Sequence, residues 1–246
     1  MCGRYSAAKP FLALVRSLGV KLQKMGEWTP RYNIAPTQSA PMVYKTANGL
    51  ELGIARWGFE SFRRENNASG PLRINARLET LADKPGFDKL HLSKRCLLPA
   101  DGFYEWQTRN GRHQPFRVVL KDQEPFFMAG LWSSGGIQRH ATSPGSSAPN
   151  QGQETETAYT VITCPACPAL QPLHDRMPVI LRGAEALAWM EIPGQTSDSI
   201  NQMAYAGPFF VYPVGVSVNS AKTEDPGCID RVRLDLDWFE QPWWEQ

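Results

Sequence analysis

The stretch of residues 102–120, GFYEWQTRNGRHQPFRVVL, constrains the fold more than any other part of the chain. Both of its halves are rich in aromatic and β-branched residues, and they meet at Asn110-Gly111. An Asn-Gly pair between two such runs is the strongest short-range signal for a two-residue hairpin turn. The segment therefore predicts two antiparallel strands that lie side by side in a sheet.

Further short segments with the composition of strands lie on both sides of this hairpin. LELGIARW at residues 50–57 alternates apolar and other residues, as one face of a strand does. The other predicted strands are FFMAGLW, AYTVITC and VYPVGVSV, at 126–132, 158–164 and 211–218. These strands follow one another along the chain without a helix between each pair, which favours antiparallel pairing.

Helical patterns are few. KPFLALVRSL, residues 9–18, predicts a short helix that Ser6 caps and Gly19 ends. Further helices are expected at AEALAWMEI, residues 184–192, and weakly after Ser197. We therefore expect an α+β fold, in which a single β-rich domain holds a barrel-like antiparallel sheet and a few helices.

The 246 residues are expected to form this one domain over positions 1–246. Residues 133–157 are polar and rich in Gly, Ser and Pro, and predict a flexible surface loop. A second polar loop, ESFRRENNASGPLR, follows Trp57-Gly58. Both loops are expected within the domain and not as linkers between domains.

Charge and hydropathy exclude several classes of protein. A formal net charge of +2 does not announce a nucleic-acid binder, so any DNA contact requires a local basic patch. Apolar runs of about 18 residues do not occur, and the first residues lack the pattern of a secretory signal. We expect an intracellular protein that does not span a membrane and whose five cysteines are reduced thiols.

Cys2, in the opening MCGRY, is unusual for its position. Once Met1 is removed, Cys2 carries a free α-amine and a thiol on adjacent carbons, a 1,2-aminothiol that internal cysteines cannot offer. An accidental cysteine at this position is the alternative.

Two other polar side chains stand in apolar surroundings. His174 lies in PLHDRMPVIL, between two prolines and just before an apolar strand. Glu105 lies in the aromatic strand DGFYEWQ, where surrounding rings favour a raised pKa and a role as general acid. A structural histidine and an outward-facing carboxylate are the alternatives.

The remaining candidates are weaker individually. PRYNIAPTQ and RINARLET each combine an asparagine, Asn33 or Asn75, with arginine, yet both asparagines are consistent with turns, and Arg77 with a pair to Glu79. CPAC at residues 164–167 is a lone pair of cysteines without a second pair of ligands, so we expect neither a metal nor another cofactor.

Taken together, these segments resemble a known family. MCGRY, RYNIAPT, RWGF, INARLET, CLLPADGFYEW, QPF, AGLW and LHDRMPVIL occur in the order and approximate spacing of the SOS-response-associated peptidase family. This abasic-site processing family includes the vertebrate 5-hydroxymethylcytosine-binding protein of embryonic stem cells. The similarity runs from Cys2 to about Asn219.

The resemblance implies a sensor of abasic sites in single-stranded DNA that crosslinks itself to the lesion through Cys2. It also implies removal of Met1, by the chain itself in the family's peptidase activity. The chemistry of the residues agrees, because an α-amine attacks the aldehyde of a baseless sugar to give an imine, and the adjacent thiol closes a thiazolidine. Closure within one molecule, at an effective molarity of about 10⁵ M or more, competes with strand cleavage.

The resemblance also assigns roles to individual residues. Glu105 is expected to open the sugar ring and relay protons, and His174 to act at the ring oxygen and set the stability of the crosslink. Asn75 is expected to position the amine or the sugar. Phosphate contacts fall to Arg4, Arg77 and Arg176, and the pocket lining to Asn33 and Pro36.

The implied partner is single-stranded DNA with abasic sites, and we expect a monomer in the cytoplasm that joins the nucleoid when bound to DNA. Two other functions stay open. One is a cysteine peptidase acting on other proteins, with Cys2 as nucleophile and His174 as base. The other is a non-covalent reader of modified bases, which does not need Cys2.

Overall fold

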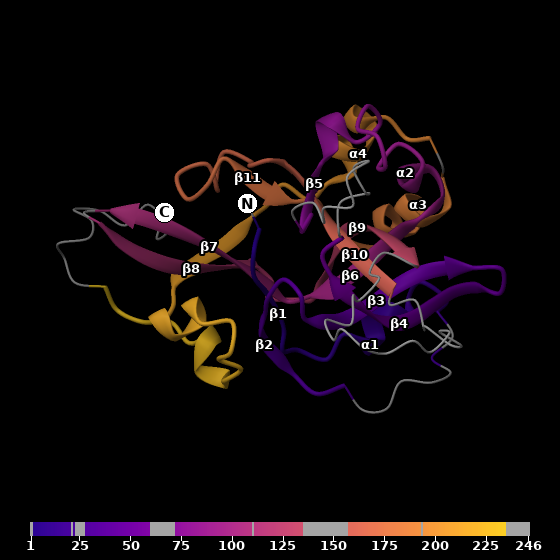
Figure 1. The fold of residues 1–246 in the computed structure, drawn as a ribbon. Helices are drawn as coiled ribbons and strands as arrows, with labels where there is room; N and C mark the ends of the chain where they lie inside the picture. Colours follow the sequence, from indigo (N-terminus) through magenta and orange to yellow (C-terminus); the bar gives the residue numbers. More distant parts are fainter. Residues whose placement is uncertain are drawn as a thin grey trace, which may run out of the picture.

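The computed structural model describes residues 2–20, 22, 28–59, 72–109, 111–134, 157–192 and 194–234 (Figure 1). The loop predicted at 133–157 falls almost wholly outside this set, since Ser134 ends one strand and Thr157 begins the next. The polar loop after Trp57-Gly58 also lies mostly outside it, as does Asn110 of the predicted turn. The single-domain boundaries stay a prediction.

The first sheet contains the predicted hairpin. It has five strands, each antiparallel to its neighbours, in the order β13 (Phe209–Pro213), β8 (Arg112–Leu120), β7 (Gly102–Arg109), β1 (Tyr5–Ala7) and β2 (Arg31–Ile34). Arg109 pairs with Arg112, and Gly111 adopts a φ of +73°, which a glycine accommodates without strain. The hairpin prediction is therefore confirmed.

The second sheet closes on itself. Its path is β11 (Arg176–Pro178), β10 (Thr157–Pro165), β4 (Gly49–Trp57), β3 (Ser39–Thr46), β6 (Arg95–Ala100), β9 (Phe126–Ser134) and β12 (Ile180–Leu181), with β5 (Asn75–Arg77) paired to β10. Because β10 also pairs with β9, the five strands from β10 through β4, β3 and β6 to β9 form a closed ring. The expected barrel-like arrangement is confirmed.

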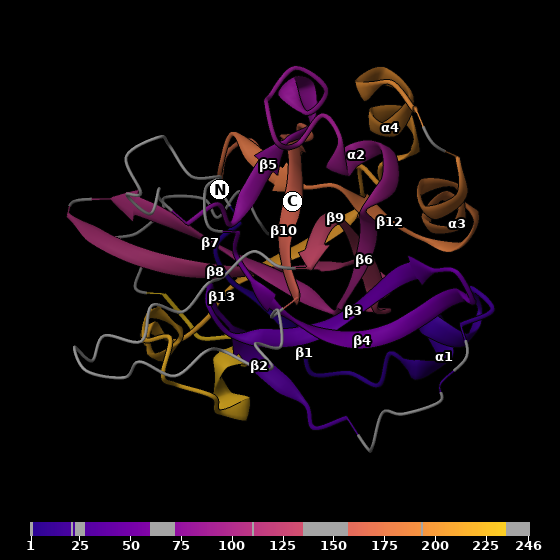
Figure 2. The same cartoon turned by 45° about the vertical axis from the view of Figure 1, so that its right-hand side comes forward.

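The barrel differs from the expectation in one respect. β10 runs parallel to both β4 and β5, whereas its pairings with β9 and β11 are antiparallel. Figure 2 shows β5 lying alongside β10. The parallel pairing places Asn75 opposite Val161. Although Asn75 is distant from Cys2 in the sequence, this pairing brings it to the part of the sheet that lies near the amino end of the chain.

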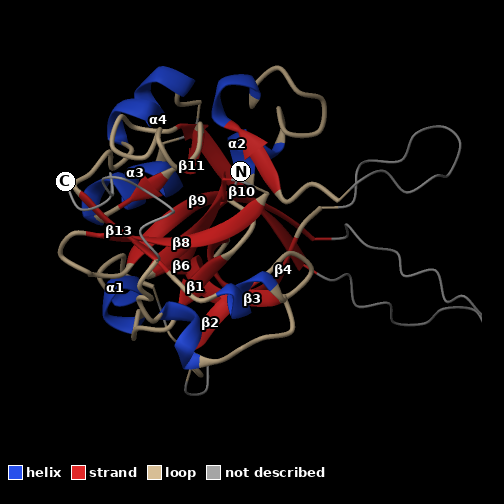
Figure 3. Ribbon diagram, turned by 90° about the vertical axis from the view of Figure 1, so that its left-hand side faces the viewer, coloured by secondary structure: helices blue, strands red, loops and turns tan. Residues whose placement is uncertain are grey.

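The helices are short and lie outside the strands (Figure 3). They are α1 (Leu12–Arg16), α2 (Leu90–Ser93), α3 (Gly183–Glu191) and α4 (Ser197–Met203), with 3₁₀ turns η1 (Leu78–Thr80), η2 (Val216–Asn219) and η3 (Pro226–Ile229). The helices expected at 184–192 and after Ser197 are confirmed. Among the described residues, none of the helices is long and apolar enough to cross a membrane.

Three local expectations are corrected. Ser6 does not cap α1, because it lies in β1 and its hydroxyl donates to Asp101. The strand predicted at 211–218 ends at Pro213, and its second half is the 3₁₀ turn η2. In β4 the alternation is present, but Trp57 is buried while Ile54 is 52% exposed. The large indole takes the inward position and so sets which face of the strand is buried.

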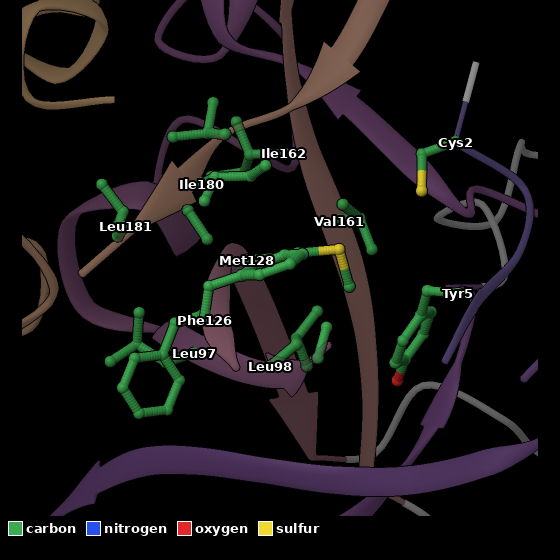
Figure 4. Close-up of a cluster of buried hydrophobic side chains, with 14 of the residues drawn as sticks. Cys2, Tyr5, Leu97, Leu98, Phe126, Met128, Val161, Ile162, Ile180 and Leu181 are labelled. Atoms are coloured by element: carbon green, nitrogen blue, oxygen red, sulfur yellow. The ribbon is translucent and has the colours of Figure 1, made fainter. Parts of the chain in front are cut away.

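A continuous hydrophobic cluster fills the barrel and extends to the amino end of the chain. Figure 4 shows Cys2 and Tyr5 on one side of β10 and barrel residues such as Met128 and Leu98 on the other. The amino end is therefore packed into the core, although chain ends usually lie in solvent. This burial gives the residues around Cys2 their unusual environment.

Candidate active site

The amino end of the chain is fixed by strand pairing. Within β1, Tyr5 lies opposite Phe103 of β7 and Ile34 of β2, and the Tyr104 amide donates to the Arg4 carbonyl at 2.9 Å. Cys2 precedes this strand by only a few residues and is fully buried. The β-sheet pairing thus holds the backbone next to Cys2 in one place, which a catalytic group requires.

Asn75 connects the second sheet to Cys2. It begins β5, and its side-chain Nδ2 donates to the Cys2 carbonyl at 2.8 Å. Its other side-chain atom, Oδ1, is buried and has no partner among the described residues. A buried acceptor without a donor is costly, so this atom is well suited to receive an N–H or O–H from a substrate or a newly formed amine.

A buried aromatic cluster supports both residues. The Trp57 indole donates to the carbonyl of Ile74, the residue before Asn75, at 2.8 Å. The same indole meets the Tyr5 ring edge-on, with 5.2 Å between ring centroids, and stacks on Tyr159. The hydroxyls of Tyr5 and Tyr159 lie 2.7 Å apart. This cluster ties the strand after Cys2 to the strand that presents Asn75.

Glu105 faces the same region from β7, where it lies opposite Phe116. Glu105 is only 4% exposed, and this burial raises the pKa of its carboxyl group to about 7. The charge of the amino terminus opposes this rise and that of Asp175 adds to it. The protonated and ionised forms of Glu105 are therefore both populated near neutral pH, which suits a residue that gives and takes protons.

The Cys2 thiol is held in its neutral form. Burial raises its pKa well above the ordinary value, and the negative charge of Glu105 raises it further. Its sulfur makes a weak contact of 3.9 Å to the Arg4 carbonyl. A thiol in this environment differs from the exposed, low-pKa thiolate of a cysteine nucleophile.

His174 lies in the loop between β10 and β11. Its Nδ1 accepts the Arg176 backbone N–H at 2.9 Å, and the Asp175 carboxylate lies 2.8 Å from the same nitrogen. Burial lowers the pKa of His174 from its usual 6.5, and the charge of the amino terminus lowers it further. At neutral pH the ring is therefore uncharged, with Nδ1 accepting and Nε2 carrying the proton. Protonation would turn Nδ1 into a donor to Asp175.

The structure brings Cys2, Asn75 and Glu105 into one region, because the Asn75 side chain bonds the Cys2 carbonyl and the charge of Glu105 acts on the Cys2 thiol. His174 joins this region through Asp175, which contacts its ring and whose charge acts on Glu105. These four residues come from both sheets.

Arg4 and Asn33 form a separate anchor. Arg4 donates to Asn33 Oδ1 at 2.8 Å and to the Val218 carbonyl at 2.7 Å, and lies over the Trp106 ring. The Asn33 Nδ2 contacts the carbonyls of Val218, Ser220 and Thr223 at 2.8–3.3 Å. Both side chains thereby hold the segment around η2 against the sheet. Pro36, half-buried, lies in the turn that follows β2.

The two arginines near β5 differ in their surroundings. Arg176 pairs with Glu79 and also donates to the Thr163 carbonyl at 2.6 Å. Glu79 therefore has Arg176 as its ion-pair partner, not Arg77, because β10 brings β5 and β11 to its two edges. Arg77 is exposed at the end of β5.

The cysteines of CPAC are buried, and all five cysteines are free thiols. Within the described ranges, no group of three or more His, Cys, Asp or Glu residues could hold a metal ion. The absence of a cofactor stays an expectation from the sequence.

Two further residues of this region were given no role from the sequence. Asp175 contacts His174 and influences Glu105, and its place beside His174 was the available signal. Gln107 lies two positions after Glu105 in β7 and donates to the Pro172 carbonyl in the His174 loop. Spacing along the strand predicts that Gln107 shares a face with Glu105, but not that it reaches another sheet.

Comparison with known proteins gives a consistent result. The chain is 32% identical to abasic site processing protein YoqW of Bacillus subtilis, covering 94% of this chain and 99% of that one. It is 28% identical to YedK of Escherichia coli over 94% and 100%, and 30% identical to HMCES of Xenopus tropicalis over 85% and 68%. A crystal structure from Bacteroides thetaiotaomicron shares the fold, with a TM-score of 0.72 at 19% identity over 94% of this chain and all of that one.

The family model of the SOS response associated peptidase matches residues 1–221, which include every candidate residue described above. With that match and the identity to YoqW across nearly the whole of both chains, this protein belongs to the SOS response associated peptidase (SRAP) family.

Proposed function

We propose that this protein senses abasic sites in single-stranded DNA and, once Met1 is removed, forms a covalent crosslink to them through Cys2. The observation that carries the proposal is the buried Cys2, held through its carbonyl by Asn75 beside a carboxyl group with a pKa of about 7. The names of the relatives, abasic site processing proteins from bacteria and vertebrates, support the same substrate.

The first chemical step is imine formation. The Cys2 α-amine attacks the aldehyde carbon of the opened sugar, forming a C–N bond, and the resulting carbinolamine loses its hydroxyl group as water. Protonated Glu105 donates a proton to the departing hydroxyl group. The resulting carboxylate then takes a proton from the nitrogen and returns to its protonated form. A pKa near 7 allows both halves of this cycle at neutral pH.

The second step closes the ring. The thiol adds to the imine carbon, a C–S bond forms, and the thiol proton ends on the nitrogen, so one water is released overall. Because burial keeps the Cys2 thiol protonated, the thiol needs a base as it attacks, and the ionised form of Glu105 takes this proton and passes it to the nitrogen. Because the closed ring has no C=N bond, the phosphate cannot be lost by β-elimination, and the strand stays intact.

Removal of Met1 has to precede both steps, because the peptide bond to Met1 occupies the α-nitrogen of Cys2. We propose that the chain hydrolyses this bond itself, with Glu105 activating the water. His174 acts on the sugar side: its neutral ring carries a proton on Nε2 and can donate it to the ring oxygen as the sugar opens.

DNA contacts are proposed for the basic residues around the site. Arg77 is exposed and therefore available to a phosphate. Arg4 and Arg176 already donate to protein groups, which orient their guanidinium groups, so a phosphate would bind to the remaining N–H groups. Asn33 and Pro36 are proposed to line the wall of the DNA-binding pocket. We further propose that the protein acts as a monomer in the cytoplasm, and on the nucleoid when bound.

The open alternatives receive less support. A peptidase acting on other proteins needs an accessible thiolate, whereas burial keeps the Cys2 thiol protonated. A non-covalent reader of modified bases does not account for a cysteine packed beside a tunable carboxyl group.

The test is intact mass spectrometry of the purified protein before and after incubation with an oligonucleotide that carries one abasic site. We expect the mass of the chain without Met1, followed by a protein–DNA adduct lighter by one water than the sum of its parts. An oligonucleotide in which the abasic sugar is reduced, and so has no aldehyde, is the control. A Met1-free chain that stays unmodified by the aldehyde substrate would refute the proposal.

A further inference from the structure

The two residues proposed to move protons come from different sheets. Glu105 lies on β7 in the first sheet, and His174 lies in the loop between β10 and β11 of the second. β1 pairs with β7 only at Gly102 and Phe103, so the following residues of β7 extend past β1. In Figure 1 the β7–β8 hairpin extends to one side of the molecule, with the chain leading to β11 above it. The distance between the two groups is therefore not set by a shared sheet.

Gln107 bridges this gap between the hairpin and the loop. Gln107 Nε2 donates to the Pro172 carbonyl at 3.2 Å, joining the hairpin to the His174 loop. Residues i and i+2 of a strand point to the same face, so Gln107 stands beside Glu105 on the side that faces the loop. Its Oε1 is buried and has no hydrogen-bond partner among the described residues, whereas the bond from Nε2 to Pro172 lies at the surface.

The loop is stiff enough to transmit this contact. The amides of Leu173 and His174 both donate to the Leu170 carbonyl, at 2.9 and 3.0 Å, forming a tight turn around Pro172. At its end the Ala166 amide donates to the Asp175 carbonyl at 2.9 Å. Holding the carbonyl of Pro172 therefore also holds His174, two residues later.

We propose that Gln107 is a positioning residue that clamps the His174 loop onto the β7–β8 hairpin and so sets the placement of His174 relative to Glu105. The contact between Gln107 and the loop is present in the structure, whereas its effect on the reaction rests on the proposed function. Gln107 itself does not need to touch the DNA for this role.

Releasing the clamp has a predictable electrostatic result. His174 is influenced by the amino terminus, Asp175 and Arg176, and Glu105 by the amino terminus and Asp175. Burial is the largest cause of the shift at both groups. If the loop moves away and water enters, both pKa values return toward their ordinary values, which lies upward for His174 and downward for Glu105.

The test compares Gln107→Met, which keeps the length of the side chain but has no donor, with Gln114→Met as a matched control. Gln114 lies opposite Gln107 in the same hairpin, and its amide donates to the Val214 carbonyl at 2.8 Å, away from the His174 loop. Gln107→Thr, which suits a strand but is too short to reach Pro172, is the second clamp variant.

Two readouts separate the clamp from general stability. The first is the titration of the His174 ring by proton NMR, assigned with His174→Gln. We expect its pKa to rise toward 6.5 in both Gln107 variants and to stay at the wild-type value in Gln114→Met. The second is the rate of adduct formation against pH, where the loss of one hydrogen bond is expected to slow the reaction about tenfold in the Gln107 variants alone.

A His174 titration identical to wild type in Gln107→Met and Gln107→Thr would overturn the clamp, as would an equal shift in Gln114→Met. These outcomes are independent of the proposed function. If the wild-type chain forms no adduct, the reaction is wrong while the NMR titration still decides whether Gln107 positions the loop.

Discussion

Two asparagines, Asn33 and Asn75, come from similar short motifs yet have very different surroundings. Asn33 is fully buried and every polar atom of its side chain has a partner, because Oδ1 accepts from Arg4 and Nδ2 contacts carbonyls of the η2 segment. Among the described residues, the Asn75 side chain makes one hydrogen bond, to the Cys2 carbonyl, and its Oδ1 has no partner. The satisfied residue stabilises the fold, and the half-satisfied one has capacity left for a ligand.

The same contrast applies to the regions around them. In the Asn33 region, the Arg4 guanidinium and the Asn33 amide bond each other and nearby carbonyls, which offsets the free-energy cost of removing these groups from water. The Asn75 region keeps Glu105 and Cys2 buried with shifted pKa values, a state that costs stability and that active sites commonly show. Variants in the first region should therefore act on folding, and variants in the second on chemistry.

The largest effect is expected for Cys2→Ser, tested after Met1 removal has been confirmed. Serine keeps the α-amine but replaces the thiol with a poorer nucleophile, so the imine forms while the stable ring does not. The adduct should be hydrolysable and trapped only by borohydride, with strand nicking by β-elimination in its absence. Denaturing gels after heating measure this, and a heat-stable Cys2→Ser adduct formed at the wild-type rate would exclude the thiazolidine.

Glu105→Gln comes next. The amide preserves the shape of the side chain but cannot donate and accept the proton in turn, so crosslinking should slow about 10²- to 10⁴-fold. DNA affinity, measured by fluorescence anisotropy with the reduced abasic oligonucleotide, should stay close to wild type. An unchanged rate at neutral pH would remove Glu105 from the mechanism.

The asparagines themselves provide the direct comparison. Asn33→Leu removes one acceptor of Arg4 and the Asn33 donor of the Ser220 and Thr223 carbonyls, and should lower the free energy of unfolding by about 4 kcal/mol. Asn75→Leu should lower it by no more than about 1 kcal/mol but slow adduct formation roughly 100-fold by misplacing Cys2. Urea denaturation and crosslinking time courses measure the two. If both variants lose only stability, the division between anchor and site is wrong.

The stability of the site should also depend on pH. Folding raises the pKa of Glu105 from 4.5 to about 7, so its contribution favours the fold below the lower value and is lost as the pH rises toward the upper one. Glu105→Gln removes this loss, and should be more stable than wild type by up to about 3 kcal/mol above pH 7, with little difference near pH 4. Urea denaturation across this range tests the sign; a constant difference would mean that the carboxyl group does not titrate on folding.

The smallest effect is expected for His174→Ala. The His174 ring is 27% exposed, so water can partly replace it and adduct formation should slow about tenfold, less than the usual range for a general acid. The finished adduct should be released more slowly, because the same proton donor serves ring opening in both directions. Wild-type rates of both formation and release would refute this role.

Much of the fold follows from local signals in the sequence. The Asn110-Gly111 turn, the apolar runs and the helix at 184–192 each depend on a few neighbouring residues, so they were predictable without the tertiary structure. Ser6 shows the limit of such signals: as a helix cap it was plausible locally, but pairing of β1 with β7 buried it beside Asp101. The strand at 211–218 likewise ended early, at Pro213.

The sequence by itself determined that a cysteine stands second in the chain, that an acid lies in an aromatic strand, and that the motifs occur in the order of the SRAP family. The tertiary structure decided the rest: that Asn75 holds Cys2 while Asn33 is an anchor, that Glu79 pairs with Arg176, and that Gln107 reaches the His174 loop. These depend on β10 and β7 bringing distant segments together. Burial, partners and pKa values are set by such long-range pairing, which the residues adjacent in sequence do not encode.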